Sequence, residues 1–306
     1  MPTKLHFTTV DVFTTTRFLG NPLAIVDIPN GTEISTKQMQ TIAREFNLSE
    51  TIFIHEATKS DEGLHEWRVR IFLVDQEVPF AGHPTIGAAC YALGTLAPGT
   101  SKGRFICNAG VLELEYQGGV AKAMVPHNFH RHTENEITVD EAYRLHPALK
   151  KANAKVQSIE VASPVKGMNF GMVELPDLET LALPSPSGVD PTLPTDEGWE
   201  GFFGGFLYVV TEQPVAGKAV KVRARMLQAG MEDPATGSGC CALSALLAMR
   251  FKLGKRTEFE ITQAVEMGRQ SDIGVVITLN DALDAVEGME LSGSSVKVME
   301  GSLEFD

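Results

Sequence analysis

The chain has 306 residues, a formal net charge of −13, and 43% hydrophobic residues. This length predicts about two domains, and the ordinary composition argues against a disordered or fibrous protein. A surface this acidic repels phosphate backbones and anionic lipids, so we expect no nucleic-acid partner and no membrane partner. Net charge does not describe a single cleft, so a local positive site for an acidic substrate is compatible with it.

Four cysteines stand at positions 90, 107, 240 and 241, and no two of them form a CxxC pair. We therefore expect reduced, mostly buried thiols, as in a reducing compartment. The N-terminal residues contain no apolar signal core. No apolar run approaches the roughly 20 residues that a membrane-spanning helix needs. These features predict a cytoplasmic protein.

The chain begins with strand patterns. Residues 5–13 alternate at period two, and residues 23–26 form a short apolar run after a Gly-Asn-Pro turn. A helix is predicted to start at Ser35, because Gln38 stands three residues later as in a capping box, and to end at Asn47. Glu50 then lies between this helix and a strand at 51–54.

A second strand, at 67–73, precedes a turn over residues 78–85. This turn opens a helix of small and apolar residues at 86–93, with Thr85 as the expected N-cap. Such a helix is apolar on nearly every side and is therefore predicted to be buried. Further strands are expected at 111–116, 121–125, 159–161, 172–175, 206–210, 220–223, 259–263, 273–279 and 296–305.

A polar loop over residues 126–133 divides the chain. We predict a first half-domain over residues 1–127, with the C-terminal strand 292–306 as a candidate to complete it, and a second over 128–291. Thr138 and Glu141 form another capping-box pattern. The Pro- and Gly-rich segment 176–205 is expected to be a long surface loop.

The second half repeats the pattern of the first, a turn followed by a buried helix. A glycine-rich turn over residues 231–239 opens another helix of small and apolar residues at 240–249. Thr85 and Thr236 occupy similar places in the two turns, about half the chain apart. This weak internal repeat indicates a duplicated fold.

Each of the two turns is predicted to belong to the active site. Backbone N–H groups at a helix N-terminus lack intrahelical partners and attract carboxylates or phosphates. If a pseudo-twofold relates the halves, both helix ends face one cleft and stabilise an enolate-like intermediate without a metal. The polar candidates are His83 in the first turn, Asp233 and Ser238 in the second, and Glu50 beside them.

Other site classes are disfavoured by spacing. His127, His130 and His132 match no standard metal motif, so no metal is expected. Gly237 and Gly239 have no following lysine, which rules out a nucleotide P-loop. No dinucleotide fingerprint appears, and no lysine stands in either turn to hold pyridoxal phosphate. We therefore expect no cofactor.

At these residues the chain resembles the PhzF family of phenazine-biosynthesis-like isomerases, nearly from end to end. The ordered motifs are Asp11-Val12-Phe13, Gly20-Asn21-Pro22-Leu23-Ala24, Asn47-Leu48-Ser49-Glu50-Thr51, Arg70-Ile71-Phe72, Glu77-Val78-Pro79-Phe80-Ala81-Gly82-His83-Pro84-Thr85, Glu232-Asp233-Pro234-Ala235-Thr236-Gly237-Ser238-Gly239, Glu266-Met267-Gly268-Arg269-Gln270-Ser271 and Val298-Met299-Glu300-Gly301. Each motif is weak alone, whereas the ordered set is specific.

The resemblance implies an α+β fold like that of diaminopimelate epimerase, with two similar half-domains, each a curved, mostly antiparallel sheet wrapped around a central helix. It also implies a homodimer and a site in the cleft between the halves. Glu50 would be the acid/base, and His83 and Asp233 would act with it. The substrate-binding residues would be Asn21, Ser49, Gly82, Thr85, Gly237, Ser238 and Gly239.

We therefore predict a cofactor-independent isomerase that moves a proton between carbons of a small carboxylated metabolite. Two alternatives stay open. An epimerase on this fold uses one cysteine in each turn, but Ala81 and Thr236 stand at those positions, and Cys240 and Cys241 lie inside the helix. A small-molecule-binding or scaffold protein would keep the fold without turnover. Residues 72–75 and 268–271 depart from the family's usual motifs, which leaves the substrate open.

Overall fold

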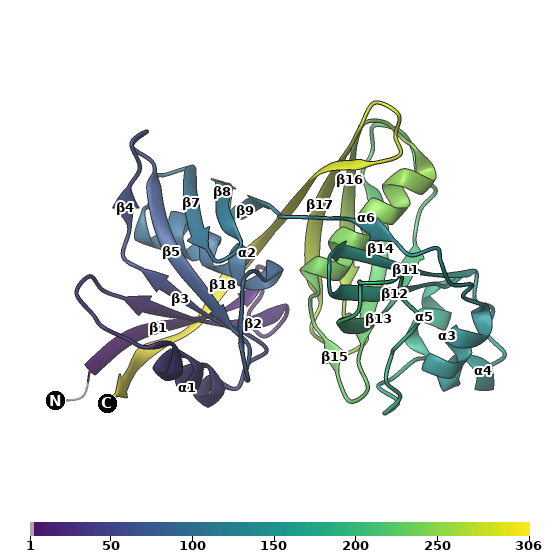
Figure 1. Cartoon of the computed structure of the whole chain (residues 1–306), viewed down its shortest axis with the longest axis horizontal. Helices are drawn as coiled ribbons and strands as arrows, with labels where there is room; N and C mark the ends of the chain where they lie inside the picture. Colours follow the sequence, from purple (N-terminus) through teal and green to yellow (C-terminus); the bar gives the residue numbers. More distant parts are fainter. Residues whose placement is uncertain (1–2) are drawn as a thin grey trace. The chain divides into compact units, whose positions relative to one another are not determined.

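A computed structural model describes residues 3–306 (Figure 1), and packing divides them into two compact units. The first unit contains the chain up to Val125 together with Leu291–Asp306, and the second contains Pro126–Glu290. Within the described residues, no helix is both long enough and apolar enough to cross a membrane.

The strands of the first unit are β1 (Thr3–Val12), β2 (Asn21–Ile28), β3 (Thr51–His55), β4 (Thr58–Lys59), β5 (His65–Phe72), β6 (Glu77–Val78), β7 (Lys102–Cys107), β8 (Gly110–Gln117) and β9 (Val120–Met124). β1 pairs antiparallel with β2, β2 parallel with β3, β3 antiparallel with β5, and β5 parallel with β7. β7, β8 and β9 continue as an antiparallel meander. The long strand β18 (Val286–Phe305) pairs with both β9 and β1 and so joins the two ends of this series.

The helix α2 (Gly82–Tyr91) is the centre of the first unit, and every one of its residues is buried. It contacts β1, β2, β3, β8 and β9. Small side chains allow this approach: a Cβ on Gly87 would lie 2.6 Å from Val12 Cγ2 and 2.7 Å from Leu23 Cδ2. A short π-helical turn, Ala92–Leu96, follows. The prediction of a buried helix is confirmed, although the helix starts four residues earlier than expected.

The helix α1 (Thr36–Phe46) follows local rules. Ser35 and Gln38 form the predicted capping box, and Asn47 ends the helix in the left-handed conformation with φ 51°. Its buried face packs on a core that includes Phe53 and Phe72. The prediction of this helix is therefore confirmed at both ends.

The strands of the second unit are β10 (His130–Arg131), β11 (Ser158–Val165), β12 (Met168–Glu174), β13 (Phe202–Val210), β14 (Val220–Leu227), β15 (Glu232–Asp233), β16 (Arg256–Gln263) and β17 (Ser271–Leu279). From β11 onward their pairings follow the same order as in the first unit: antiparallel, parallel, antiparallel, then parallel between β14 and β16, then antiparallel. The helix α6 (Gly237–Phe251) contacts β11, β12, β16 and β17 and is buried over most of its length.

Three short helices complete the second unit: α3 (Val139–Leu145), α4 (Pro147–Lys151) and α5 (Leu178–Ala182). The capping box predicted at Thr138 is wrong, because its side chain makes no cap hydrogen bond and Glu141 instead pairs with Arg144 at 2.7 Å. Segment 176–205 is not one surface loop. It contains α5, and the buried side chains of Leu193 and Asp196 anchor it.

Two short turns lead into α2 and α6, and a matching ion pair stands before each. Arg70 pairs with Glu77 and Arg225 with Glu232, both through Nε and Nη2 at 2.6–2.9 Å. The spacing between corresponding residues is constant, since 225 − 70, 232 − 77 and 237 − 82 all equal 155. Gly82 therefore corresponds to Gly237, which corrects the match of Thr85 with Thr236.

Mixed sheets around buried helices make this an α+β protein, as predicted. The sequence patterns did not predict β7, and they predicted only the second half of β18. Both segments contain glycine and polar residues, and their strand conformation depends on partners far along the chain.

Candidate active site

The first candidate site lies where β2, β3 and α2 begin. β2 and β3 are parallel neighbours, with Ala24 opposite Thr51, so their N-terminal ends share one edge of the sheet. Asn21 opens β2, and Glu50 immediately precedes β3. His83 stands in the first turn of α2. The topology thereby brings together three predicted residues that are far apart in sequence.

A carboxylate and an imidazole meet at this edge. Glu50 Oε2 lies 3.5 Å from His83 Nδ1, and the two side chains are 17% and 4% exposed. Asn21 Nδ2 also lies 3.5 Å from His83 Nδ1. Asn21 is buried and follows Gly20, which has a φ of +68°. A Cβ on Gly20 would lie 2.2 Å from Val12 O, so this position admits only glycine.

Burial raises the pKa of the Glu50 carboxyl above its ordinary value, and a hydrogen bond from the Ser49 side chain opposes that rise. The desolvated carboxylate binds a proton more tightly than an exposed one does. A carboxyl group whose pKa moves toward neutrality can both take and return a proton, which is the property of a general acid/base.

The N-terminus of α2 is not capped by a side chain. Its N-cap is Ala81, in an extended conformation, and not Thr85 as predicted. Thr85 lies inside the helix, and its hydroxyl donates back to Ala81 O at 2.8 Å. A helix that starts without a capping hydroxyl or carboxylate presents its first turn to other acceptors, as anion-binding helix ends do.

The second turn holds Asp233, Thr236, Gly237, Ser238 and Gly239. Thr236 is the N-cap of α6, but its side chain makes no cap hydrogen bond. Instead its Oγ1 donates to Asp233 Oδ2 at 2.6 Å. A Cβ on Gly239 would lie 2.7 Å from Phe206 Cε2, so the small residue is required for the helix to approach β13.

The two cysteines of α6 are poor nucleophiles. Both are fully buried. Burial raises the pKa of the Cys240 thiol well above its ordinary value and that of the Cys241 thiol to about 12. Because the thiolate is the reactive form, neither cysteine is prepared for proton exchange at neutral pH.

Three potential metal ligands of the second unit, His130, His132 and Asp196, lie within 4.8 Å of one another. Most of their polar atoms are already paired. Asp196 accepts from His130 Nε2 at 2.7 Å and from the backbone of Thr133 and Glu134. His132 Nδ1 accepts from Asp196 N at 2.9 Å, and its Nε2 lies 2.8 Å from Ser163 Oγ. A metal would have to break these bonds, so the cluster is best described as an anchor for segment 176–205.

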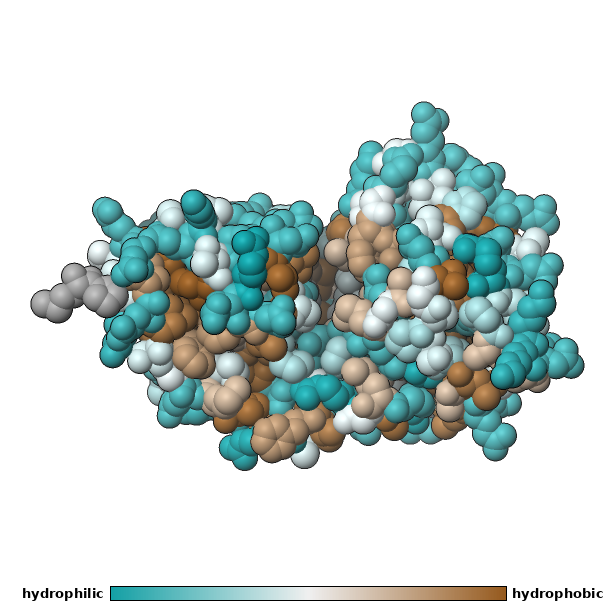
Figure 2. Space-filling view, turned by 90° about the horizontal axis from the view of Figure 1, so that it is seen from below, coloured by the Kyte–Doolittle hydropathy of each residue, from teal (hydrophilic) through white to brown (hydrophobic). Residues whose placement is uncertain are grey.

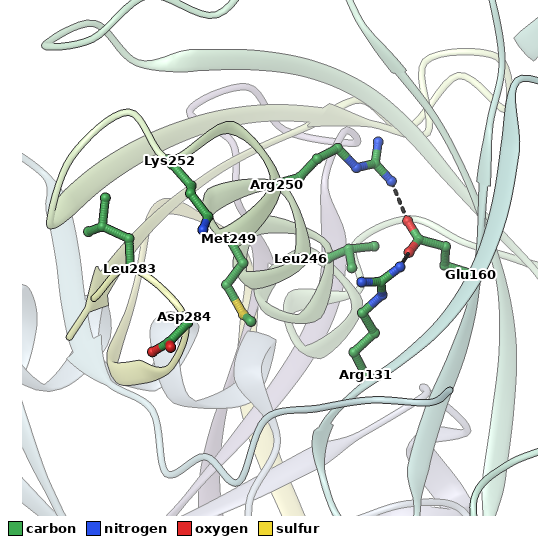
Figure 3. A pocket seen from close by; sticks show the side chains of 8 residues that line it. All are labelled: Arg131, Glu160, Leu246, Met249, Arg250, Lys252, Leu283 and Asp284. Atoms are coloured by element: carbon green, nitrogen blue, oxygen red, sulfur yellow. Dashed lines mark hydrogen bonds and ion pairs between the residues drawn. The ribbon is translucent and has the colours of Figure 1, made fainter. Parts of the chain in front are cut away.

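Two cavities elsewhere contain none of the predicted site residues. A pocket of about 240 Å³ surrounds the C-terminal end of α6 (Figure 3), where Arg131 and Arg250 both pair with Glu160. A groove of about 950 Å³ lies between α1 and the end of β18, with Phe7, Phe46 and Phe305 among its lining residues. Figure 2 shows hydrophobic residues among hydrophilic ones on the surface of the first unit.

Sequence reasoning missed the residues that support the two turns. Arg225 was overlooked, and so was Gln263, whose buried amide reaches the second turn; Glu232 was named only as part of a family motif, without its pairing with Arg225. The signal available in the sequence was the recurrence of Arg-x6-Glu before each turn at a spacing of 155.

A desolvated carboxylate beside an imidazole is an arrangement that can transfer protons by acid/base chemistry, as in one class of enzymes. Residues 10–301 match the sequence profile of the family described as phenazine biosynthesis-like protein. The chain therefore belongs to this family, commonly called the PhzF family.

Several of its relatives are named isomerases. The chain is 31% identical to an uncharacterized isomerase of Mesorhizobium japonicum, over 96% of each chain. It is 27% identical to trans-2,3-dihydro-3-hydroxyanthranilate isomerase of Pseudomonas chlororaphis, over 97% of this chain and 99% of that one. The crystal structure of a PhzF-family protein of Bacillus anthracis superposes with a TM-score of 0.78 at 19% identity, covering 98% of this chain and 99% of the other. The protein is thus a PhzF-type isomerase, as predicted.

Proposed function

We propose that this isomerase moves a proton between two carbons of a small carboxylated metabolite and that Glu50 carries the proton. The observation behind the proposal is the position of Glu50, desolvated and 3.5 Å from His83. The ionised carboxylate takes the proton from an activated carbon and, once protonated, returns it to another carbon. No other reactant is consumed, because one proton is taken and one is returned, and the carboxyl proton exchanges with solvent between the two steps.

His83 is placed to assist this transfer. Its ring lies against Glu50 and Asn21, and it stands in the first turn of α2. In this proposal the imidazole orients Glu50 and the substrate, while the positive end of the helix attracts negative charge that develops on the substrate. The chemistry uses residues of the chain alone, without a cofactor.

The role proposed for the second turn, which contains Asp233 and Ser238, follows from its similarity to the first turn. We propose that the two units are half-domains of a duplicated fold, because their strand pairings and their Arg–Glu pairs recur in the same order. The participation of Asp233 and Ser238 in the same reaction as Glu50 stays a prediction, as does the homodimer.

The first substrate to test is the compound named for the relative from Pseudomonas chlororaphis, trans-2,3-dihydro-3-hydroxyanthranilate. It represents the proposed class, a carboxylated ring in which a double bond acidifies a neighbouring C–H bond. An identity of 27% leaves the substrate of this chain open, so related cyclic dienes and amino-acid carboxylates belong in the same panel.

The test is incorporation of deuterium from D₂O into substrate carbons, followed by mass spectrometry and NMR. We expect exchange with the wild-type protein and a loss of about 10²–10⁴-fold in Glu50→Gln, the range that a positioned acid/base contributes. Glu45→Gln, a charge-matched change at an exposed position of α1, is the control and should leave the rate unchanged. Exchange that persists in Glu50→Gln would contradict the assignment.

The same experiment separates the alternatives. Inversion at one carbon without double-bond migration would favour an epimerase. Binding of a panel compound without any exchange would favour a binding protein.

A stability measurement verifies that Glu50→Gln is folded. Because the pKa of Glu50 is raised in the folded state, ionisation weakens the fold as pH rises through that pKa, and this loss is absent below the ordinary value. The variant should therefore be at least as stable as the wild type at neutral pH.

A further inference from the structure

We propose that Gln263 is a positioning residue that fixes the direction of the Thr236 hydroxyl and, through it, the orientation of the Asp233 carboxylate. The structural part of this proposal stands on the second turn alone. Its catalytic part rests on the proposed function, in which Asp233 acts on the substrate.

Gln263 is the last residue of β16, and its side chain is fully buried. Its Oε1 accepts from Thr236 N at 3.1 Å and from Cys240 Sγ at 3.5 Å. Its Nε2 donates to Asp233 O at 2.9 Å and to Thr236 Oγ1 at 3.0 Å. A single amide thus satisfies two acceptors and two donors around the turn, so both ends of the amide are in use.

The bond to Thr236 has a directional consequence. A hydroxyl carries one hydrogen. Because Thr236 Oγ1 accepts the Gln263 amide hydrogen, its own hydrogen is left to donate to Asp233 Oδ2, 2.6 Å away. Asp233 Oδ1 is held by Ala235 N at 3.4 Å. The series Gln263, Thr236, Asp233 therefore sets the carboxylate in one orientation.

Only an amide gives this polarity. An ionised glutamate at position 263 would keep an acceptor for Thr236 N but would offer no hydrogen to Thr236 Oγ1, and its carboxylate would accept the threonine hydrogen and withdraw it from Asp233. The protonated form, which burial favours, has one donor where the amide has two and cannot serve both Asp233 O and Thr236 Oγ1. Gln263→Glu therefore disrupts the relay with almost no change in side-chain size.

The first unit uses the corresponding amide differently. Asn108 stands 155 positions before Gln263 (263 − 108), and its Nδ2 donates to Glu77 Oε1 at 2.9 Å. The shorter side chain thus supports the Arg70–Glu77 pair, whereas the extra methylene of Gln263 reaches the turn itself. The relay is consequently a feature of the second turn, where the acidic candidate Asp233 stands.

The test is a double-mutant cycle with Gln263→Glu and Thr236→Val. The first readout is hydrogen exchange of the Ala235 amide, measured by NMR without substrate. We expect each substitution to speed this exchange at least tenfold and the double variant to exceed neither by more than about twofold, because both break one relay. Unchanged exchange in Gln263→Glu, or effects that multiply in the double variant, would overturn the relay.

The second readout is the rate of deuterium incorporation into substrate. We expect each variant to lose about 10–100-fold in kcat with a smaller change in KM, as for a misplaced reacting group. Thr236→Ser keeps the hydroxyl and should restore most of the rate, so Thr236→Val and Thr236→Ser decide the question even if Gln263→Glu does not fold. Gln157→Glu, at an exposed position of the same unit, is the charge-matched control.

The two readouts fail independently. Faster amide exchange with an unchanged rate would confirm the relay and overturn the role of Asp233 in the reaction. Inactivity of the wild type on every substrate would contradict the proposed function, while the amide exchange would still decide the relay.

Discussion

Arg225 should be one of the most costly polar residues to replace. Its guanidinium donates twice to Glu232, at 2.9 and 2.7 Å, and to the carbonyls of Leu181 and Pro184 at 2.9 and 2.8 Å. The side chains of Arg225 and Glu232 are only 5% and 6% exposed. Arg225→Met keeps much of the volume but leaves a buried carboxylate and two carbonyls without this donor.

The expected loss follows from that burial. Removing one partner of a buried ion pair costs about 3–5 kcal/mol, because the remaining charge is neither solvated nor paired. Arg70→Met provides the internal comparison, since the Arg70–Glu77 pair has the same geometry but side chains that are 16% and 20% exposed. Water can solvate Glu77 after the substitution, so we expect a loss of about 1–2 kcal/mol.

Tryptophan fluorescence can follow the urea unfolding of each unit separately, because the chain has two tryptophans, Trp67 in the first unit and Trp199 in the second. Arg225→Met is measured in a Trp67→Phe background and Arg70→Met in a Trp199→Phe background. Adding Glu232→Gln to Arg225→Met should recover most of the loss, since no buried charge remains unpaired. An equal loss for the two arginine variants, or no recovery in the double variant, would refute the argument from burial.

Two further changes test packing and titration. Gly239→Ala should destabilise by about 1–3 kcal/mol in urea unfolding, because its Cβ would lie 2.7 Å from the Phe206 ring, whereas Gly230→Ala meets nothing within 4 Å and should be neutral. Burial, with Arg225 nearby, lowers the pKa of His146 to about 4, below its ordinary 6.5. The fold should therefore lose up to about 3 kcal/mol as pH falls from 6.5 to 4. His146→Gln should show a smaller loss over that interval, and equal pH dependence in both proteins would contradict this origin.

Local rules predicted the parts of the fold that local interactions determine. The capping box at Ser35 and the left-handed residue at Asn47 set the ends of α1. The same reasoning failed at α2, where it favoured Thr85 because a hydroxyl usually caps a helix. This helix begins instead after Ala81, a residue without a capping group, which a general preference cannot anticipate.

The residues of the candidate site were predicted through family motifs, whereas their proximity comes from pairing between distant strands. Nothing local in the sequence places His83 within 3.5 Å of Glu50; the parallel pairing of β2 with β3 and the burial of α2 do so. Gln263 was missed for the same reason, since its partners are about thirty residues earlier in the chain. β7 was not predicted because it begins with polar and glycine residues, which lack an alternating apolar pattern; its strand conformation depends on pairing with β5 and β8.

The strand β18 has a consequence for the order in which the protein folds. It pairs with β1 from Thr3–Phe305 to Val12–Ser295, so the first unit gains this strand only after the whole second unit has been synthesised. Contacts between the two ends of a chain are the slowest to form, because closing a longer loop costs more entropy. During translation the incomplete first unit therefore exposes an unpaired strand edge at β1, the kind of surface that chaperones protect.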